Sequence, residues 1–346
     1  MKFGIVALWR DSVEDFVQEV QAAERHGMDL LGVGDSQAGY RELYVSLAVA
    51  AAHTQRIKLG PMVTNPVTRH PAVTASAIAS IDRLSGGRAT LGIGTGGSAV
   101  WTIGQPPARI ADLTDYVQAL RDLMREGSAT YGGNSVTVQD VERPVPVLVS
   151  AEGPRALALA GALADGVILH AGTSPTAIDW CMNHLRKGAE SVGRDVQELE
   201  IWMMLKASVA DTREAALEAV RAGLAGSASH ALRHGAADKG VPPELLEPVA
   251  RLIDQYDASQ HGVASSANAD LVEKYGLTDF LAGYFGLVGT PEQCAQSLDA
   301  LASHGIEGVI CPASAVDPLA LIHRLGDEVL PLVTSRAHAQ EAIPAT

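Results

Sequence analysis

The stretch LGPMVTNPVTRHPAVTASAIASIDRLSGGRATLGIGTG, residues 59–96, contains the repeating unit on which the fold depends. An apolar run at 57–64 is followed by an alanine-rich pattern that begins at Pro71, and two glycines separate this pattern from a second apolar run at 88–94. Proline in the first turn and glycine after the last turn are typical of the two ends of a helix. The stretch therefore predicts a strand, a helix and a second strand in succession.

The same alternation extends in both directions along the chain. Short runs rich in Val and Ile, each followed by a helical pattern, predict eight strands, at 3–9, 29–34, 57–64, 88–94, 145–151, 166–171, 199–210 and 307–313. Such units form either an open doubly wound sheet or a closed barrel, and the count of eight favours the barrel. We therefore expect an α/β fold, a (β/α)8 TIM barrel, with a single domain over residues 1–346.

Two insertions interrupt the predicted units. Residues 127–144 contain GGNSVTVQD, which predicts a small hairpin. A polar stretch with helical pieces, about 225–285, lies between strands seven and eight. Eight units therefore account for the chain apart from these two insertions.

Composition and charge argue against several functions. The 346 residues include 26 Lys and Arg against 40 Asp and Glu, a net charge of −14 without a basic cluster, which argues against a nucleic-acid partner. The three cysteines lie far apart, as expected in a reducing compartment. No stretch approaches about 18 apolar residues, and the first residues lack the features of a signal peptide. We expect a cytoplasmic protein with no membrane contact.

TIM barrels carry their active sites at the carboxyl ends of the strands, and this rule selects candidate residues. No G-x-G-x-x-G run opens a unit, so a dinucleotide-binding fold is not indicated. The candidates for catalysis are Asp35 and His170. The candidates for cofactor binding are Met62, Val63, Thr64, Asn65, Thr95, Gly96, Ser150, Ala151, Gly153, Pro154 and Ala171.

The run Ser150-Ala-Glu-Gly-Pro-Arg155 places a glycine and a proline where a strand passes into a helix. Free N–H groups and the helix dipole attract anions at such an end, and a glycine lets a phosphate approach. The same residues also occur where proline simply begins a helix. The glycines at 94–97 likewise have two interpretations, room for a flat ring or an ordinary turn.

The histidines have both chemical and structural interpretations. His170 can donate a proton or hold a phosphate, although an isolated histidine is commonly only a satisfied polar residue. His26 and His53 lie on helices away from the strand ends, which predicts a surface position. The histidines of the second insertion are too widely spread for a convincing metal site; they are His230, His234 and His261. We therefore expect no metal.

The run 59–96 resembles the bacterial luciferase-like flavin oxidoreductases. Within them it is similar to the methylenetetrahydromethanopterin reductases, which use the deazaflavin coenzyme F420. The similarity extends to VSAEGPRALALAGALADGVI (149–168) and LVGTPEQCAQSLDALASHGIEGVI (287–310), so it covers most of the chain except 225–285. It implies a barrel with 225–285 as a lid over its mouth, and a flavin-type ring at the strand ends.

The resemblance also implies details of the site and of assembly. Deazaflavin relatives have a non-proline cis peptide bond after strand three, and the matching bond here joins Met62 and Val63. Many relatives have Asp-His after strand two, but here Asp35 is followed by Ser36, so Asp35 would orient the ring or the substrate. Relatives often pair through helices two and three, which predicts a homodimer or higher homo-oligomer.

Several functions remain open at this point. The first is an F420-dependent oxidoreductase that transfers hydride to or from a small organic substrate. The second is a monooxygenase that uses reduced FMN and O2 with a partner flavin reductase, because the missing histidine leaves the cofactor undecided. A non-catalytic flavin-binding protein is the third. A metal-dependent barrel lyase is disfavoured, because ordered carboxylates are missing from the strand ends.

Overall fold

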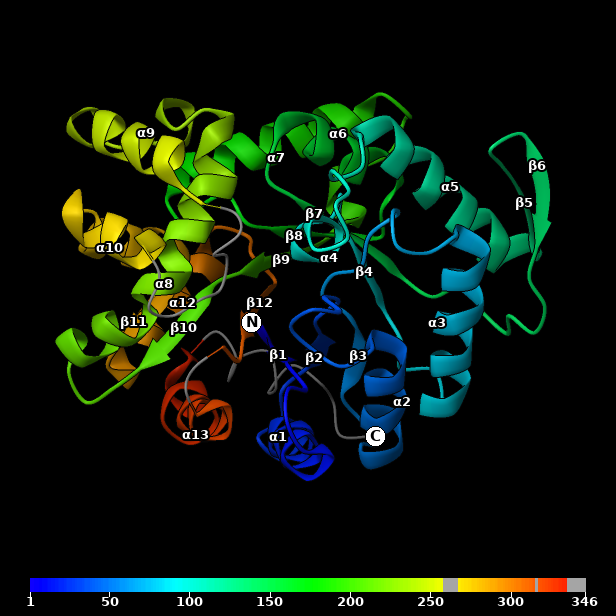
Figure 1. Cartoon of the computed structure of the whole chain (residues 1–346), viewed down its shortest axis with the longest axis horizontal. Coiled ribbons are helices and arrows are strands. Elements are labelled where there is room, and N and C mark those ends of the chain that lie inside the picture. Colours follow the sequence, from blue (N-terminus) through cyan, green and yellow to red (C-terminus); the bar gives the residue numbers. More distant parts are fainter. Residues whose placement is uncertain (258–266, 315–316, 335–346) are drawn as a thin grey trace.

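A computed structural model describes residues 1–257, 267–314 and 317–334 of the chain (Figure 1). In this part, eight parallel strands form one sheet in the order β3-β2-β1-β12-β9-β8-β7-β4. Their bounds are β1 Lys2–Ala7, β2 Leu30–Val33, β3 Lys58–Pro61, β4 Leu91–Ile93, β7 Val147–Ala151, β8 Gly166–Leu169, β9 Glu200–Met204 and β12 Gly308–Pro312. Parallel bridges from Leu59 to Ala89 and from Thr64 to Ile93 join the two outer strands. The sheet is therefore closed, which confirms the predicted TIM barrel.

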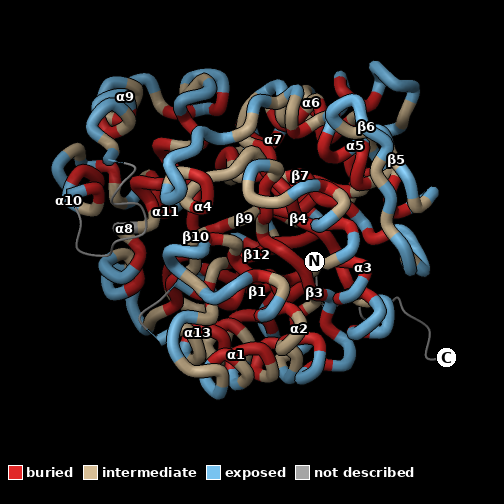
Figure 2. Tube along the Cα trace, turned by 45° about the vertical axis from the view of Figure 1, so that its right-hand side comes forward, coloured by how far each residue is buried: buried red, intermediate tan, exposed pale blue. Residues whose placement is uncertain are grey.

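The barrel interior is filled by apolar side chains from all parts of the chain. They include Val6, Leu30, Met62, Leu148, Ile168, Trp202 and Ile310. A larger apolar cluster lies between the strands and the surrounding helices. Figure 2 shows the buried segments in the centre and the exposed ones on the outer surfaces of the helices. This two-layer burial is the reason that the strands read as continuous apolar runs in the sequence.

Helices follow the strands as the alternation predicts. Their bounds are α1 Val13–Arg25, α2 Leu43–His53, α3 Pro71–Ser85, α4 Ser98–Trp101, α5 Ile110–Glu126, α6 Pro154–Leu163, α7 Pro175–Glu190, α8 Arg213–Ala231, α12 Pro291–Ser303 and α13 Pro318–Arg324. Pro71 occupies the first turn of α3, and Gly86 ends that helix in the left-handed conformation. The predicted hairpin is confirmed as antiparallel β5 (Ser128–Tyr131) and β6 (Asn134–Thr137). None of the described helices is long and apolar enough to cross a membrane.

The predicted seventh strand, 199–210, is wrong in its extent, because the chain divides at Leu205. The N–H of Leu205 still donates to the carbonyl of Ile310 in the barrel. From Lys206 the chain leaves the barrel as β10 (Lys206–Val209) and pairs with β11 (Gly286–Gly289) in a separate sheet. A continuous apolar run cannot show that its second half changes partner.

The insertion between β9 and β12 has an apolar cluster of its own. It contains the end of α8 and the helices α9 (Leu246–Gln255), α10 (Ala267–Lys274) and α11 (Thr278–Phe285). Figure 1 shows these helices together with β10 and β11 on one side of the barrel. Buried residues such as Leu224, Leu252 and Leu281 pack among themselves here. The insertion therefore has a core of its own, while hydrogen bonds such as those from Thr173 to Gly283 and from Tyr284 to Ala171 attach it to the barrel.

The closest helix contact in the outer layer lies between α6 and α7. A Cβ atom added to Gly188 would lie 2.0 Å from the carbonyl oxygen of Ala158, and one added to Gly161 would lie 2.1 Å from that of Leu185. Real side chains never approach a backbone atom so closely. The two glycines thus allow the backbones of α6 and α7 to touch.

We predict that Gly188→Ala lowers the free energy of unfolding by about 1–3 kcal/mol, because the added methyl group overpacks this contact. Gly283→Ala is the matched control, since a Cβ at this exposed glycine of α11 meets no atom within 4 Å. There alanine should raise stability by about 0.4–1 kcal/mol, because it restricts the unfolded chain. Urea denaturation measures the stability of the two variants. Equal denaturation midpoints for Gly188→Ala and Gly283→Ala would contradict the packing argument.

A buried carboxyl group lies on the inner side of α1. Glu19 is only 8% exposed, and its Oε2 has no hydrogen-bond partner among the described residues. Burial raises the pKa of Glu19 from 4.5 to about 7. The folded protein therefore holds a proton here that the unfolded chain releases between about pH 4.5 and pH 7.

This proton predicts a pH-dependent stability. The free energy of unfolding should fall as the pH rises through that window, since above pH 7 the folded state must bury a charged carboxylate. Glu19→Gln should therefore be more stable than the parent protein at pH 8, by about 1–3 kcal/mol, with a smaller difference at pH 5. The exposed Glu14→Gln on the same helix is the control. Thermal denaturation at the two pH values would refute the idea if the Glu19→Gln advantage did not grow with pH.

Candidate functional site

A cis peptide bond joins Met62 and Val63, as the resemblance predicts. It lies just after β3, before the chain rejoins β4 through the bridge from Thr64. Added Cβ atoms on Gly32 and Gly92 would lie 2.5 Å from Met62 Cγ and 3.1 Å from Met62 Sδ. These glycines make room for the Met62 side chain inside the barrel, while the backbone bulges at the strand end.

Asp35 belongs to a buried polar network beside this bulge. Its Oδ2 accepts hydrogen bonds of 2.7 Å from Thr64 Oγ1 and from Arg69 Nη1, and its side chain is 6% exposed. Arg69 also contacts Glu42 at 2.7 Å through Nη2. Burial opposes the charge of Arg69, but its bonds to the two carboxylates raise its pKa overall. Asp35, predicted as catalytic, is thus engaged in holding Thr64.

Asn65 and the glycine-rich turn meet at the same place. Asn65 Oδ1 accepts hydrogen bonds from the N–H groups of Val67 and Thr68, so its side chain holds the turn that follows Thr64. Gly96 has φ +101°, and a Cβ there would lie 3.3 Å from the Cβ of Asn65. Thr95 directly precedes it. The structure therefore brings the predicted residues after β3 and after β4 side by side.

A carboxylate–imidazole–hydroxyl chain lies at the ends of β7 and β8, the strands next to β4 around the barrel. His170 Nδ1 is 3.0 Å from Glu152 Oε1, and His170 Nε2 is 3.1 Å from Ser227 Oγ. Burial opposes the charge of Glu152, but the bond to His170 and the nearby imidazoles lower its pKa overall. Glu152 follows β7, His170 follows β8 and Ser227 lies on α8. The chain can hold or pass a proton between the barrel and the insertion.

A fully buried lysine connects the insertion to this chain of groups. Lys239 has no exposed surface, and its Nζ donates to the carbonyls of Glu152 at 2.9 Å and Ala231 at 2.7 Å. The ammonium also lies 4.4 Å from the ring centre of Trp180. Burial lowers the pKa of Lys239. This contact fixes the insertion directly behind Glu152.

The predicted anion pocket lies at the start of α6. Gly153 is the N-cap of this helix, Pro154 occupies its first turn, and no side chain caps the free N–H groups. A Cβ at Gly153 would lie 3.3 Å from His234 Cγ. His234 comes from the insertion, so the helix end is covered by an imidazole. Sequence spacing could not show this neighbour.

Three further predicted residues have limited roles. Ser150 is half-buried and lies next to Gly94, whose added Cβ would be 3.5 Å from that of Ser150. Ala151 and Ala171 are each 1% exposed and belong to the apolar core. Their methyl groups pack in the core, so only their backbone atoms remain available to a ligand.

Two basic side chains complete this side of the mouth. Lys206 begins β10, where the chain leaves the barrel, and its backbone is paired with Gly286 of β11. Within the described ranges its ammonium group makes no hydrogen bond or ion pair. Burial lowers the pKa of Lys206 and that of His230. The ring of His230 contacts Trp101 edge to face at 5.7 Å. His261, the third histidine considered in this insertion, lies outside the described residues.

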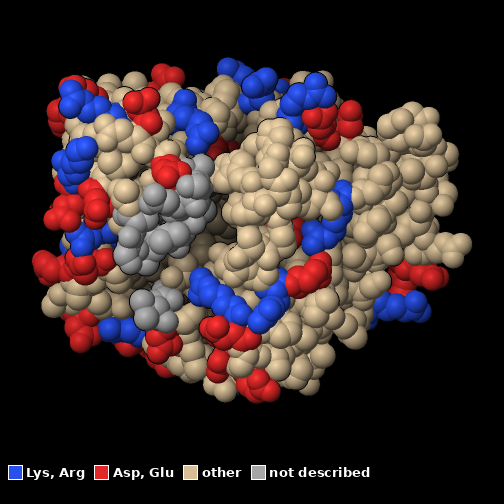
Figure 3. All heavy atoms as spheres, in the orientation of Figure 1, with Lys and Arg blue, Asp and Glu red and all other residues tan. Residues whose placement is uncertain are grey.

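The hollow at the mouth (Figure 3) is distinct from a cavity at the amino ends of the strands. Figure 3 shows the molecule hollowed near the centre of the view, with Lys and Arg side chains gathered below the hollow. A cavity of about 110 Å³ lies elsewhere, lined by residues at the amino ends of strands, including Leu30, Lys58 and Glu200. Because barrel chemistry occurs at the carboxyl ends, this cavity is not the candidate active site.

Several residues of the mouth escaped the sequence analysis. Glu152 follows a predicted strand, so the strand-end rule includes it. The sequence does not show its partner, because His170 comes close to Glu152 only in the folded barrel. Ser227, Lys239 and Arg69 lie on helices or loops that the rule does not select. Lys239 stands in a polar stretch, between Asp238 and Gly240, so nothing in the sequence indicates that its side chain is buried.

Comparison with known proteins gives the family context. Residues 1–308 match the family described as luciferase-like monooxygenase. The chain is 29% identical over 325 residues to 5,10-methylenetetrahydromethanopterin reductase of Methanolobus tindarius, covering 90% of this chain and 93% of that protein. It is 33% identical over 222 residues to an F420-dependent glucose-6-phosphate dehydrogenase of Nakamurella multipartita. This alignment covers 58% of this chain and 65% of that protein. The structure of the coenzyme F420-dependent tetrahydromethanopterin reductase of Methanopyrus kandleri has the same fold, with a TM-score of 0.78, 24% identity and 95% and 98% coverage.

We predict that Lys239→Met opens the insertion, because two buried carbonyls lose their donor, at about 1–3 kcal/mol each. Hydrogen exchange should rise at the end of α8 and in residues 232–245, while the barrel strands stay protected. Lys274→Met, an exposed lysine of the same insertion, is the matched control. Unchanged exchange in the Lys239→Met protein would show that Lys239 does not hold the insertion.

Proposed function

The chain belongs to the luciferase-like monooxygenase family, and within it we propose an oxidoreductase that uses coenzyme F420 to transfer hydride to or from a small organic substrate. The observation that carries this proposal is the alignment over nine-tenths of the chain with a methylenetetrahydromethanopterin reductase. The F420-dependent relative from Nakamurella supports the same cofactor. The cis bond at Met62–Val63, at the mouth of the barrel, supports it from the structure.

The residues present at the mouth fit such a cofactor. The uncapped start of α6 offers free N–H groups to an anionic tail. A Cβ at Gly97 would meet no atom within 4 Å, so the backbone is open beside this turn. We propose that the cofactor is held by Met62, Val63, Thr64, Asn65, Thr95, Gly96, Ser150, Ala151, Gly153, Pro154 and Ala171. When bound, F420 supplies the hydride chemistry, and the protein supplies position and electrostatics.

We assign different roles to the two predicted catalytic residues. His170 holds a proton at the mouth, and Glu152 orients its ring through Nδ1. Asp35 acts through Thr64 and Arg69, so it positions the bulge after β3 and leaves proton transfer to His170.

The insertion excludes water from this site in our proposal. His234 lies over Gly153, and Ser227 reaches His170, so two of its side chains contact the strand ends. Closure over a hydride-transfer site prevents loss of the reducing equivalent to solvent. The region 225–285 would therefore act as a lid and provide contacts to the substrate.

Assembly as a homo-oligomer is part of the proposal. Val45 on α2 and Val73 on α3 are 54% and 56% exposed, on the helices through which relatives pair. Apolar side chains on neighbouring helices are suited to contact with a second copy. Light scattering of the purified protein gives the oligomeric state.

We predict micromolar binding of F420 to the purified protein, measured by quenching of cofactor fluorescence. A parallel titration with FMN separates the alternatives, since binding of FMN alone would favour the monooxygenase with a partner reductase. Binding of both without turnover of any substrate would favour a flavin-binding protein. Absence of F420 binding would refute the proposal.

Gly153→Glu should weaken F420 binding about tenfold or more, because a carboxylate at the start of α6 repels an anionic tail. Gly153→Ala measures the steric effect on His234 without the charge. Gly283→Glu makes the same substitution on an exposed helix of the insertion and should leave the affinity unchanged. Equal affinities for Gly153→Glu and Gly283→Glu would remove the start of α6 from the cofactor site.

A further inference from the structure

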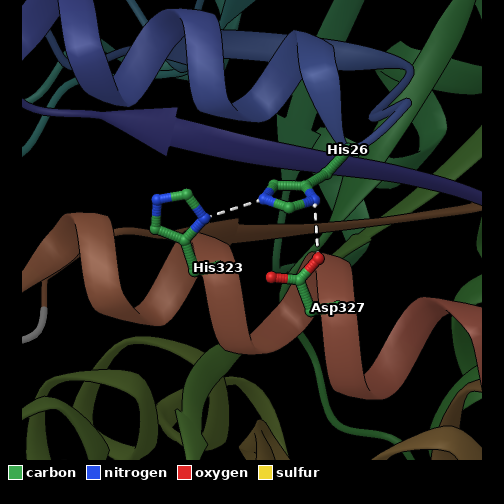
Figure 4. A group of neighbouring side chains, drawn as sticks. All are labelled: His26, His323 and Asp327. Atoms are coloured by element: carbon green, nitrogen blue, oxygen red, sulfur yellow. Dashed lines mark hydrogen bonds and ion pairs between the residues drawn. The ribbon is translucent and has the colours of Figure 1, made fainter.

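Three titratable side chains meet outside the mouth, where α1 contacts α13 and the turn that follows it (Figure 4). His26 follows the end of α1, His323 lies on α13, and Asp327 lies on the π-helical turn Leu325–Val329. His26 Nε2 is 2.9 Å from His323 Nδ1, and His26 Nδ1 is 3.4 Å from Asp327 Oδ1. Within the described residues, this group could hold a metal ion.

The facing imidazole nitrogens are spaced nearly as two ligands of one metal ion are. A ring nitrogen without hydrogen is a ligand for Zn²⁺ and similar ions. Two such nitrogens bound to one tetrahedral ion at 2.0–2.1 Å lie about 3.3 Å apart. The nitrogens of His26 and His323 are 2.9 Å apart, so binding one ion requires them to separate by about 0.4 Å and both rings to turn until their lone pairs point at the ion.

Asp327 supplies the outer partner that such a site needs. Metal-binding histidines commonly donate their second N–H to a carboxylate, which fixes the tautomer and raises ligand basicity. Asp327 faces the Nδ1 of His26, so it leaves Nε2 as the ligand atom. The neighbouring Arg324 does not compete for Asp327, because its guanidinium contacts Glu328 and Asp211.

The backbone is shaped around His26. A Cβ at Gly326 would lie 2.1 Å from His26 Cγ, so only glycine lets this ring lie against the π-helical turn. The His26 side chain is 14% exposed, which corrects the predicted surface position, whereas Asp327 is 65% exposed. The ring is thus held in place while solvent reaches the group.

We propose that His26 and His323 bind a divalent transition metal ion of the Zn²⁺ type, with Asp327 orienting His26. Water or a further ligand fills the remaining positions of the tetrahedral ion. The site lies on the outer layer, apart from the proposed F420 site, and joins the first and last helices of the barrel. The three buried thiols do not compete, since burial raises the pKa of Cys181, Cys294 and Cys311.

Titration calorimetry with ZnCl2 on the full chain, freed of metal with a chelator, tests the proposal at pH 7.5. We expect one saturable Zn²⁺ site, with His323→Ala and His26→Gln each abolishing it. Asp327→Asn should weaken binding about 10–100-fold, the usual effect of removing a carboxylate behind a ligand histidine. Bound Co²⁺ should show the visible absorption of a tetrahedral ion, lost in the same variants.

Two surface histidines are the matched controls. His53→Gln and His304→Gln remove exposed imidazoles elsewhere and should leave the Zn²⁺ affinity unchanged. His323→Ala keeps the test valid if His26→Gln fails to fold against Gly326. Zn²⁺ binding that survives in His323→Ala, or no saturable binding by the parent protein, would overturn the proposal and leave the group as a hydrogen-bonded bridge.

Discussion

Closure of the barrel between β3 and β4 is the constraint from which the rest of the structure follows. The two strands approach so closely that a Cβ at Gly60 would lie 1.9 Å from the carbonyl oxygen of Thr90, and one at Gly92 would lie 2.4 Å from that of Pro61. Only glycine permits this contact. The backbone joins β4 again at Thr64, after the cis bond, and Thr64 in turn holds Asp35. The same junction therefore closes the sheet and forms one wall of the mouth.

The neighbouring wall, at the ends of β7 and β8, depends on contacts between the barrel and its insertion. Glu152 and His170 come from neighbouring strands, but Ser227 and Lys239 come from the insertion. Their hydrogen bonds tie a separately packed apolar cluster to two strand ends. Chemistry at this wall is thus coupled to the position of the insertion, whereas the wall near Met62 is fixed by the barrel alone.

Most of the fold could be predicted from the sequence, because each strand is a short apolar run and each helix has local end signals. The N-cap Ser12 and the 127–144 hairpin are local in this sense. The break at Leu205 could not be predicted, because β10 changes partner without a change in composition. The sequence predicted that the site lies at the strand ends. It could not predict the Glu152–His170–Ser227 chain or the Arg69–Asp35 pair, because these contacts join residues that are distant in sequence. The cis bond came from resemblance, since nothing local at Met62 indicates it.

The attachment of the insertion through Lys239 has a consequence for how such enzymes diversify. The outer helices of the insertion pack on one another, and the β10–β11 pair forms a sheet separate from the barrel beside them. Substitutions on those helices can therefore accumulate without disturbing the strand ends, provided the buried ammonium keeps its two carbonyl acceptors. Selection for a new substrate could remodel the insertion while the hydride-transfer machinery below is inherited unchanged.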